Sequence, residues 1–196
     1  MHQAIGRFFR SYLAHSTEPT ADTLFNLLNA LHSLNDRLRK QTGSDLFDCD
    51  EFLALKALRN FLHHEAELPS KITVVPLSSG MTDLLFMCLA RSEHVNRAFA
   101  NPRIGAEDRP RMESVIRFYG PVADLNPCVF NCAVKIFEKV ERLGVTPKDE
   151  PAYEEFKASY EYESQNRLPH LNSFGKLAKG EGRHAQRTSG VHPFGV

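Results

Sequence analysis

Apolar residues at helical spacing are the feature that most limits the folds open to this chain of 196 residues. Leucines recur every three or four positions in its second helical segment: Leu24, Leu27, Leu28, Leu31, Leu34 and Leu38. This period lines them up on one side of an α-helix, and that side must be buried against another element. Thr20 is a suitable N-cap and Gly43 a natural terminator, so the pattern predicts a helix over residues 20–42.

The same periodicity continues along most of the chain. It predicts further helices over residues 2–15, 48–65, 81–101, 111–119, 126–143 and 150–166. Asp48 and Glu51 have the spacing of a capping box at the start of the segment 48–65. Residues 69–80 are β-branched in part and are expected to form an extended connector or a hairpin edge, without a sheet. The sequence therefore predicts a single-domain, all-α bundle of about six or seven helices.

The helical pattern stops at the C-terminal end of the chain. We predict a helical domain over residues 1–168 and a flexible, Gly-rich basic tail over residues 169–196. Such a tail either solubilises the protein or contacts RNA phosphates or an acidic groove of a partner protein. The cations that could make those contacts are Lys176, Lys179, Arg183 and Arg187.

Composition excludes several classes of protein. Lys plus Arg equals Asp plus Glu at 24 each, so bulk electrostatic binding of nucleic acid is not expected, although a local basic site is compatible with this balance. No apolar run approaches the length of a membrane span or of a signal peptide, so we expect a cytoplasmic protein without membrane contact.

No motif for a metal or other cofactor is evident. The cysteines lack Cys-x-x-Cys spacing and are expected to be free buried thiols: Cys49, Cys88, Cys128 and Cys132.

One cluster of polar groups stands out against this apolar framework. It is the stretch Arg59-Asn60-Phe61-Leu62-His63-His64, near the end of the segment 48–65. At about 100° per residue, Lys56 and the polar members of this stretch fall on the arc opposite the apolar residues. Arginine can hold a phosphate and histidine can transfer protons near neutral pH, so these residue types suit phosphodiester cleavage without a metal.

Two observations weigh against this hypothesis. A polar arc of this kind is also typical of any solvated surface helix. The Arg-x4-His spacing itself recurs at Arg10–His15 and Arg187–His192. What distinguishes Arg59 is the asparagine that follows it and the leucine-rich frame around it.

In this context the segment resembles the HEPN superfamily, a group of small all-α domains that includes many metal-independent RNases. Arg59, Asn60 and His64 stand in the places of its Arg-Asn-x-x-x-His motif, and the resemblance covers about residues 20–66. It implies a dimer or higher homo-oligomer whose motifs face one another. It further implies that a histidine activates a ribose 2′-OH, while Arg59 stabilises the charged phosphate in the transition state. The products would carry a 2′,3′-cyclic phosphate and a 5′-hydroxyl.

The resemblance leads to two hypotheses. The first is an RNA endonuclease that acts as a toxin or antiviral defence effector, with a possible antitoxin or partner protein. The alternative is a non-catalytic HEPN-like subunit that binds RNA or protein in a larger assembly. Two histidines compete for the role in catalysis: His64 fits the motif, whereas His63 lies on the same line of the helix as Arg59.

Other polar residues are weaker candidates for the site. Asn29, His32 and Asp36 share a polar line on the helix 20–42, which either faces the motif or is solvated. Lys56 is a candidate RNA contact, and His94 is expected at the surface.

Overall fold

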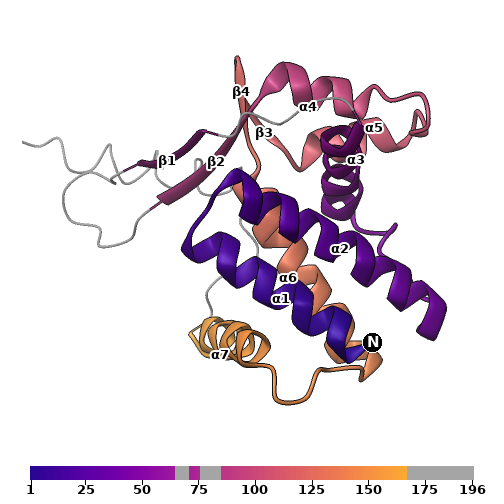
Figure 1. Cartoon of the computed structure of the whole chain (residues 1–196), viewed down its shortest axis with the longest axis vertical. Helices are drawn as coiled ribbons and strands as arrows, with labels where there is room; N and C mark the ends of the chain where they lie inside the picture. Colours follow the sequence, from indigo (N-terminus) through magenta and orange to yellow (C-terminus); the bar gives the residue numbers. More distant parts are fainter. Residues whose placement is uncertain (65–70, 76–84, 167–196) are drawn as a thin grey trace, which may run out of the picture.

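The computed structural model describes residues 1–64, 71–75 and 85–166, and this part of the chain is largely α-helical, as predicted (Figure 1). Its helices are α1 (His2–Thr17), α2 (Ala21–Thr42), α3 (Asp50–His64), α4 (Ser92–Phe99), α5 (Asp108–Ser114), α6 (Asn126–Leu143) and α7 (Pro151–Gln165). Its strands are β1 (Lys71–Val75), β2 (Leu85–Arg91), β3 (Arg117–Tyr119) and β4 (Val122–Asp124). None of the described helices is long and apolar enough to cross a membrane. The predicted tail lies outside the described residues.

Helix α2 begins and ends where the sequence predicts. Thr20 is its N-cap and forms a capping box with Thr23, whose side chain accepts from the Thr20 backbone N–H at 2.8 Å. Gly43 ends the helix with φ of 72°, a left-handed conformation that glycine adopts without strain. These local signals explain why both ends of this helix could be read from the sequence.

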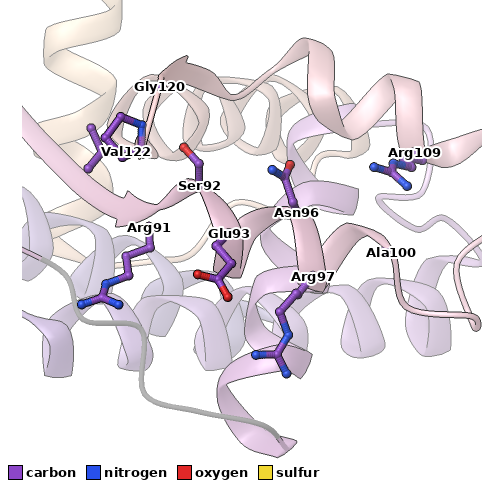
Figure 2. A pocket seen from close by; sticks show the side chains of 10 residues that line it. Arg91, Ser92, Glu93, Asn96, Arg97, Ala100, Arg109, Gly120 and Val122 are labelled. Atoms are coloured by element: carbon purple, nitrogen blue, oxygen red, sulfur yellow. The ribbon is translucent and has the colours of Figure 1, made fainter.

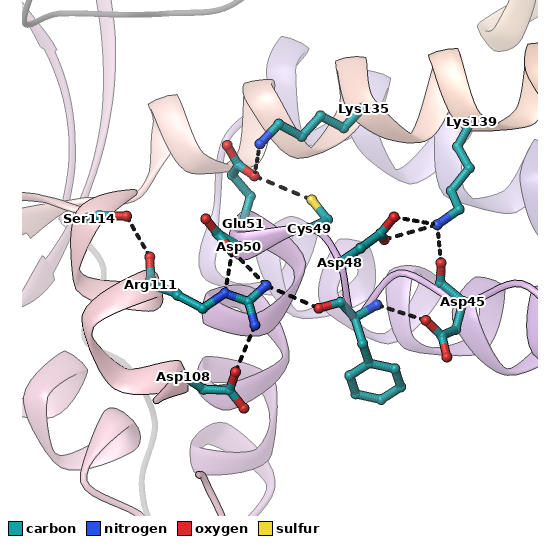
Figure 3. Close-up of polar contacts among 11 residues, drawn as sticks. Asp45, Asp48, Cys49, Asp50, Glu51, Asp108, Arg111, Ser114, Lys135 and Lys139 are labelled. Carbon is teal, nitrogen blue, oxygen red and sulfur yellow. Dashed lines mark hydrogen bonds and ion pairs between the residues drawn. The ribbon is translucent and has the colours of Figure 1, made fainter. Parts of the chain in front are cut away.

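The predicted capping box of α3 is wrong. The helix begins at Asp50, and the two carboxylates that were expected to cap it bind lysines of α6 instead (Figure 3). Asp48 accepts from Lys139 at 2.9 Å, and Glu51 accepts from Lys135 at 2.5 Å. Charge-assisted bonds across helices are stronger than a local cap, so tertiary contacts override the local signal here.

These ion pairs fix the N-terminal end of α3 within the fold. On its other side, the guanidinium of Arg111 in α5 binds Asp50 at 2.7 Å and Asp108 at 2.8 Å (Figure 3). Helix α3 is thus held by α6 on one side and α5 on the other. Its C-terminal half, which carries the predicted motif, extends from this anchored end.

A small antiparallel sheet corrects the purely helical prediction. Its strand order is β1-β2-β4-β3, with β2 paired to both β1 and β4. Strand β2 occupies the start of the predicted helix 81–101, and β3 occupies the end of the predicted helix 111–119. The β2 sequence is apolar on both sides, and such a short run fits a buried strand as well as a helix. Gly120, with φ of 62°, lies in the turn between β3 and β4.

The core is built around the apolar sides of α2 and α3. All six leucines of the α2 stripe are at most 2% exposed. Helix α3 contacts α2, α4, α5 and α6, which together cover most of its circumference. Helices α1 and α7 extend the core through an aromatic cluster in which Phe9 lies 5.0 Å from Tyr153 and 5.1 Å from Phe156, measured between ring centroids.

The four cysteines are free and buried, as predicted. Burial raises the pKa of the Cys88 thiol to about 12, so this group is a neutral thiol at physiological pH. The Cys88 thiol therefore contributes to packing rather than to reactivity.

Candidate functional site

The polar arc predicted for α3 is present at the protein surface. Lys56, Arg59 and Asn60 are half-buried and His63 is exposed, whereas the apolar residues of the same helix are buried apart from the half-buried Leu62. This division follows from the helical period, because α2, α4, α5 and α6 cover the apolar side. The arc therefore forms a polar strip of α3 that reaches solvent.

An asparagine of α2 joins the arginine and a histidine of this arc. The Asn29 side-chain oxygen accepts a 3.2 Å hydrogen bond from Arg59 Nε and lies 2.9 Å from His63 Nε2. Arg59 also donates through Nη1 to Asn60 Oδ1 at 3.3 Å. Among the polar line predicted on α2, it is Asn29 that faces the motif.

The rest of that line has another role. His32 and Asp36 form a pair with each other along α2, with 3.4 Å between Nδ1 and Oδ2. This contact is local to one helix, so the two residues do not add to the group at Arg59.

Phe25 lies beside this group and was missed in the sequence. Its ring centroid is 5.1 Å from that of His63, and the planes are inclined by 48°. Phe25 is 37% exposed, which is unusual for a phenylalanine in a helix that buries its other large apolar residues. The sequence does contain a signal for this exposed position, because Phe25 stands one helical turn before Asn29 on the polar side of α2.

Two hollows lie near the arc: one is lined in part by Asn29, which binds Arg59, and the other by Lys56 and Asn60. The α1–α2 hollow has a volume of about 380 Å³, and its polar lining residues are Arg7, Arg10, Ser11, Thr23, Asn26 and Asn29. The α3–α5 hollow has a volume of about 320 Å³, and its polar lining residues are Lys56, Asn60, Asn101, Arg103 and Asp108. Arg59 forms a hydrogen bond with one residue of each hollow, Asn29 and Asn60. It therefore stands at the boundary between them.

A third and more open hollow lies at the start of α4, outside the predicted site (Figure 2). This α4 hollow has a volume of about 910 Å³ and is lined by Arg91, Arg97 and Arg109. In Figure 2, Glu93 lies between Arg91 and Arg97. Arg109 binds Glu113 at 2.8 Å, and the Arg97 guanidinium lies 5.5 Å from the centroid of the Phe61 ring. Of the predicted site residues whose side chains the structure describes, none lines this hollow.

The remaining predicted site residues have different outcomes. Lys56 is part of the arc, and its Nζ lies 4.3 Å from the centroid of the Phe47 ring. His64 is the last residue of α3, but its side chain is not described. The four cations of the predicted tail, Lys176, Lys179, Arg183 and Arg187, lie outside the described residues. Their roles stay predictions.

The second Arg-x4-His pair of the described chain does not form a comparable group. Arg10 pairs with Glu150, whereas His15 is buried and its Nδ1 lies 3.0 Å from Thr23 Oγ1. Burial lowers the pKa of His15 to about 4, so this histidine is neutral at physiological pH. Spacing alone thus fails to identify the site.

His94, which is expected at the surface, is half-buried. Its ring packs 5.6 Å from that of Phe61, and its Nδ1 is buried without a hydrogen-bond partner in the described part of the chain. This contact between α3 and α4 could not be anticipated because the segment 81–101 is predicted as one helix.

The geometry at Arg59 suits the binding of a phosphate. A guanidinium has five N–H donors, and the bonds to Asn29 and Asn60 use two of them. The amide of Asn29 fixes the guanidinium and the imidazole of His63 with respect to one another. An anion bound by Arg59 would therefore lie close to a group that can transfer protons.

Comparison of the chain with family models, curated proteins and solved structures finds no match. The resemblance to the HEPN superfamily thus rests on the motif and its helical frame, and it stays a prediction.

Proposed function

We propose that this protein is a metal-independent RNA endonuclease of the HEPN type, acting through Arg59 and a histidine at the end of α3. One observation carries the proposal: the Asn29 oxygen binds Arg59 and His63 together at the protein surface. A phosphate-binding cation and a proton-transfer group are the two components that metal-free RNA cleavage requires.

The proposed reaction is an internal transesterification. A histidine removes the proton from a ribose 2′-OH, and the resulting oxygen attacks the adjacent phosphorus. The bond from phosphorus to the 5′-oxygen breaks, and an acid protonates that leaving oxygen. Arg59 offsets the charge that builds up on the phosphate oxygens. The products carry a 2′,3′-cyclic phosphate and a 5′-hydroxyl, and DNA cannot react because it lacks the attacking group.

The surroundings of Arg59 support an extended RNA strand as the substrate. Phe25 offers an exposed ring on which a base can stack beside His63. Arg7 in the α1–α2 hollow and Lys56 in the α3–α5 hollow add cations to the surroundings of Arg59. They supply the local positive charge that a protein of zero net charge needs for this substrate.

The proposal includes a second protomer. One motif supplies a single arginine and two histidines at most, so we infer that a homodimer or higher homo-oligomer completes the set of acid and base. Such an enzyme suits a toxin or an antiviral defence effector, controlled by an antitoxin or another partner protein.

The test is cleavage of a labelled RNA in EDTA by the wild type and by Arg59→Ala, His63→Ala and His64→Ala. We expect wild-type cleavage with cyclic phosphate ends, loss of activity in Arg59→Ala, and loss in at least one histidine variant. His32→Ala is the matched control, because His32 pairs within α2. Full activity of Arg59→Ala, or cleavage that requires a divalent metal, would refute the proposal.

A second candidate is a non-catalytic subunit that binds RNA or protein in a larger assembly. It is favoured by the exposed aromatic residues of β3, an edge strand of the sheet: Phe118 is 36% exposed and Tyr119 is 41% exposed. Edge strands and exposed aromatic groups are common docking elements. This candidate predicts a stable complex with a partner and no cleavage under the conditions above.

A further inference from the structure

The α3–α5 hollow has the composition of a ligand site rather than of a surface crevice. Its volume of about 320 Å³ falls at the lower end of the range for small-molecule pockets. Buried apolar side chains form part of its lining: Leu53, Ala57, Ala98 and Met112. The half-buried Ile104 and five half-buried or exposed polar residues complete it. A lining that combines apolar side chains with polar groups suits a planar ring that carries hydrogen-bonding edges.

The charges of the hollow favour an anionic ligand. Lys56 and Arg103 contribute two cations, whereas Asp108 contributes the only acidic group among the lining residues. Asp108 is already paired with Arg111 at 2.8 Å, so its negative charge is partly offset. A ring that carries a phosphate, as in a nucleotide, satisfies both the apolar lining and the cations.

Hydrogen bonds within the hollow limit which base fits best. The Asn60 oxygen accepts from Arg59, and the Asn101 oxygen accepts from the Arg103 backbone N–H at 3.0 Å. Both amides therefore have their NH₂ groups left to donate to a ligand. The Asp108 carboxylate has acceptor capacity beyond its bond to Arg111. Several donors and one carboxylate match guanine, which has acceptors at O6 and N7 and donors at N1 and N2.

From this arrangement we propose that the α3–α5 hollow binds a guanine nucleotide, with Asp108 reading the base edge and Lys56 and Arg103 binding phosphate. The hollow adjoins the motif, because Asn60 lines it and also accepts a bond from Arg59. In the proposed endonuclease, the hollow would place a guanosine of the RNA next to the phosphate that is cut. This placement rests on the proposed function. Binding of the free nucleotide does not depend on that activity.

The test is calorimetric titration of the full-length protein with GMP, AMP, CMP and UMP. We expect GMP to bind at least about tenfold more tightly than the other three, since a good pair of base-edge bonds discriminates to that degree. Asp108→Asn should abolish this preference, and Arg103→Ala should weaken GMP binding about tenfold. Arg91→Ala, which removes a cation of the α4 hollow, is the matched control and should bind GMP as the wild type does.

The outcomes separate this proposal from the proposed endonuclease. If Arg59→Ala still binds GMP, the nucleotide site in the α3–α5 hollow is supported. If the wild type does not cleave RNA, the proposed endonuclease activity is refuted without affecting that site. Equal, weak binding of all four nucleotides, or a preference for GMP that Asp108→Asn leaves intact, overturns the pocket even if RNA is cleaved. Thermal unfolding of each variant, compared with the wild type, shows whether a lost affinity reflects lost folding.

Discussion

Asn29 and Arg59 are joined by a 3.2 Å hydrogen bond from the guanidinium Nε to the amide oxygen, across the interface of α2 and α3. The same oxygen lies 2.9 Å from His63 Nε2, so a single amide of α2 sets the positions of two groups on α3. The geometry of the candidate site therefore depends on how the two leucine-rich helices pack. Asn29 need not touch the substrate, yet it sets the positions of Arg59 and His63, which are proposed to do so.

Replacing Asn29 with alanine should impair RNA cleavage while leaving the fold intact. Arg59 and His63 would lose their shared acceptor and sample other rotamers, and misplacement of catalytic groups on the ångström scale can cost about a hundredfold in rate. The loss of two solvent-accessible hydrogen bonds should cost only about 1–2 kcal/mol of stability. Single-turnover cleavage and thermal unfolding measure the two effects. Asn26→Ala, in the same hollow, is the control, and equal rates in the two variants would contradict the prediction.

Replacing Phe25 with alanine should weaken RNA binding. Base stacking on an aromatic side chain contributes about 1–3 kcal/mol per base, so the Kd should rise by about fivefold or more. Phe25→Trp should preserve the affinity, because it retains a ring. Fluorescence anisotropy with labelled single-stranded RNA measures the Kd of each variant, in an Arg59→Ala background that prevents cleavage. Tyr162→Ala removes another exposed aromatic side chain, 62% exposed on α7, and should have no effect. A Phe25→Ala variant that binds RNA as tightly as the Tyr162→Ala control would rule out the stacking role.

The parts of the site that could be predicted are those that depend on a single helix. The leucine stripe of α2 and its caps lie in consecutive residues, and so does the polar arc of α3. The contact between Asn29 and Arg59 depends on how the two helices are rotated and shifted relative to one another. The sequence identified Asn29 as a polar residue facing away from the leucines, but periodicity contains no information on which neighbour it meets.

The sheet could not be predicted for a related reason. Strand β2 has no polar side to show whether its period is two or 3.6 residues, and β3 and β4 have only three residues each. Their identity depends on pairing with one another, which joins residues 117–119 to 122–124. The two aromatic residues before Gly120 are compatible with a hairpin, but the helical period of the preceding residues predicts the end of a helix there.

Replacing Lys135 with methionine should destabilise the protein substantially. The Glu51 side chain is only 5% exposed and would lose the partner that now binds it at 2.5 Å. Breaking a buried ion pair from one side costs about 3 kcal/mol, and we expect about 1–3 kcal/mol here because the Lys135 side chain is 36% exposed. Adding Glu51→Gln should recover part of that loss. Urea unfolding measures both values, with Arg109→Met as the control, since its pair with Glu113 is exposed on both sides and is expected to contribute less than about 1 kcal/mol. A K135M variant no less stable than the R109M control would contradict the role of this pair.

Stability should fall between pH 6.5 and pH 4 because of His15. Burial lowers its pKa from 6.5 to about 4, so in this window the unfolded chain binds a proton that the folded protein does not. The free energy of unfolding therefore decreases as the pH falls, by about 3 kcal/mol in total, and is fully regained above pH 6.5. His15→Gln removes this titration and should flatten the stability profile over the same window. Urea unfolding of both proteins at half-unit steps of pH tests this, with His32→Gln as a control that retains His15 and its slope. Parallel profiles for the wild type and His15→Gln would show that another group causes the acid sensitivity.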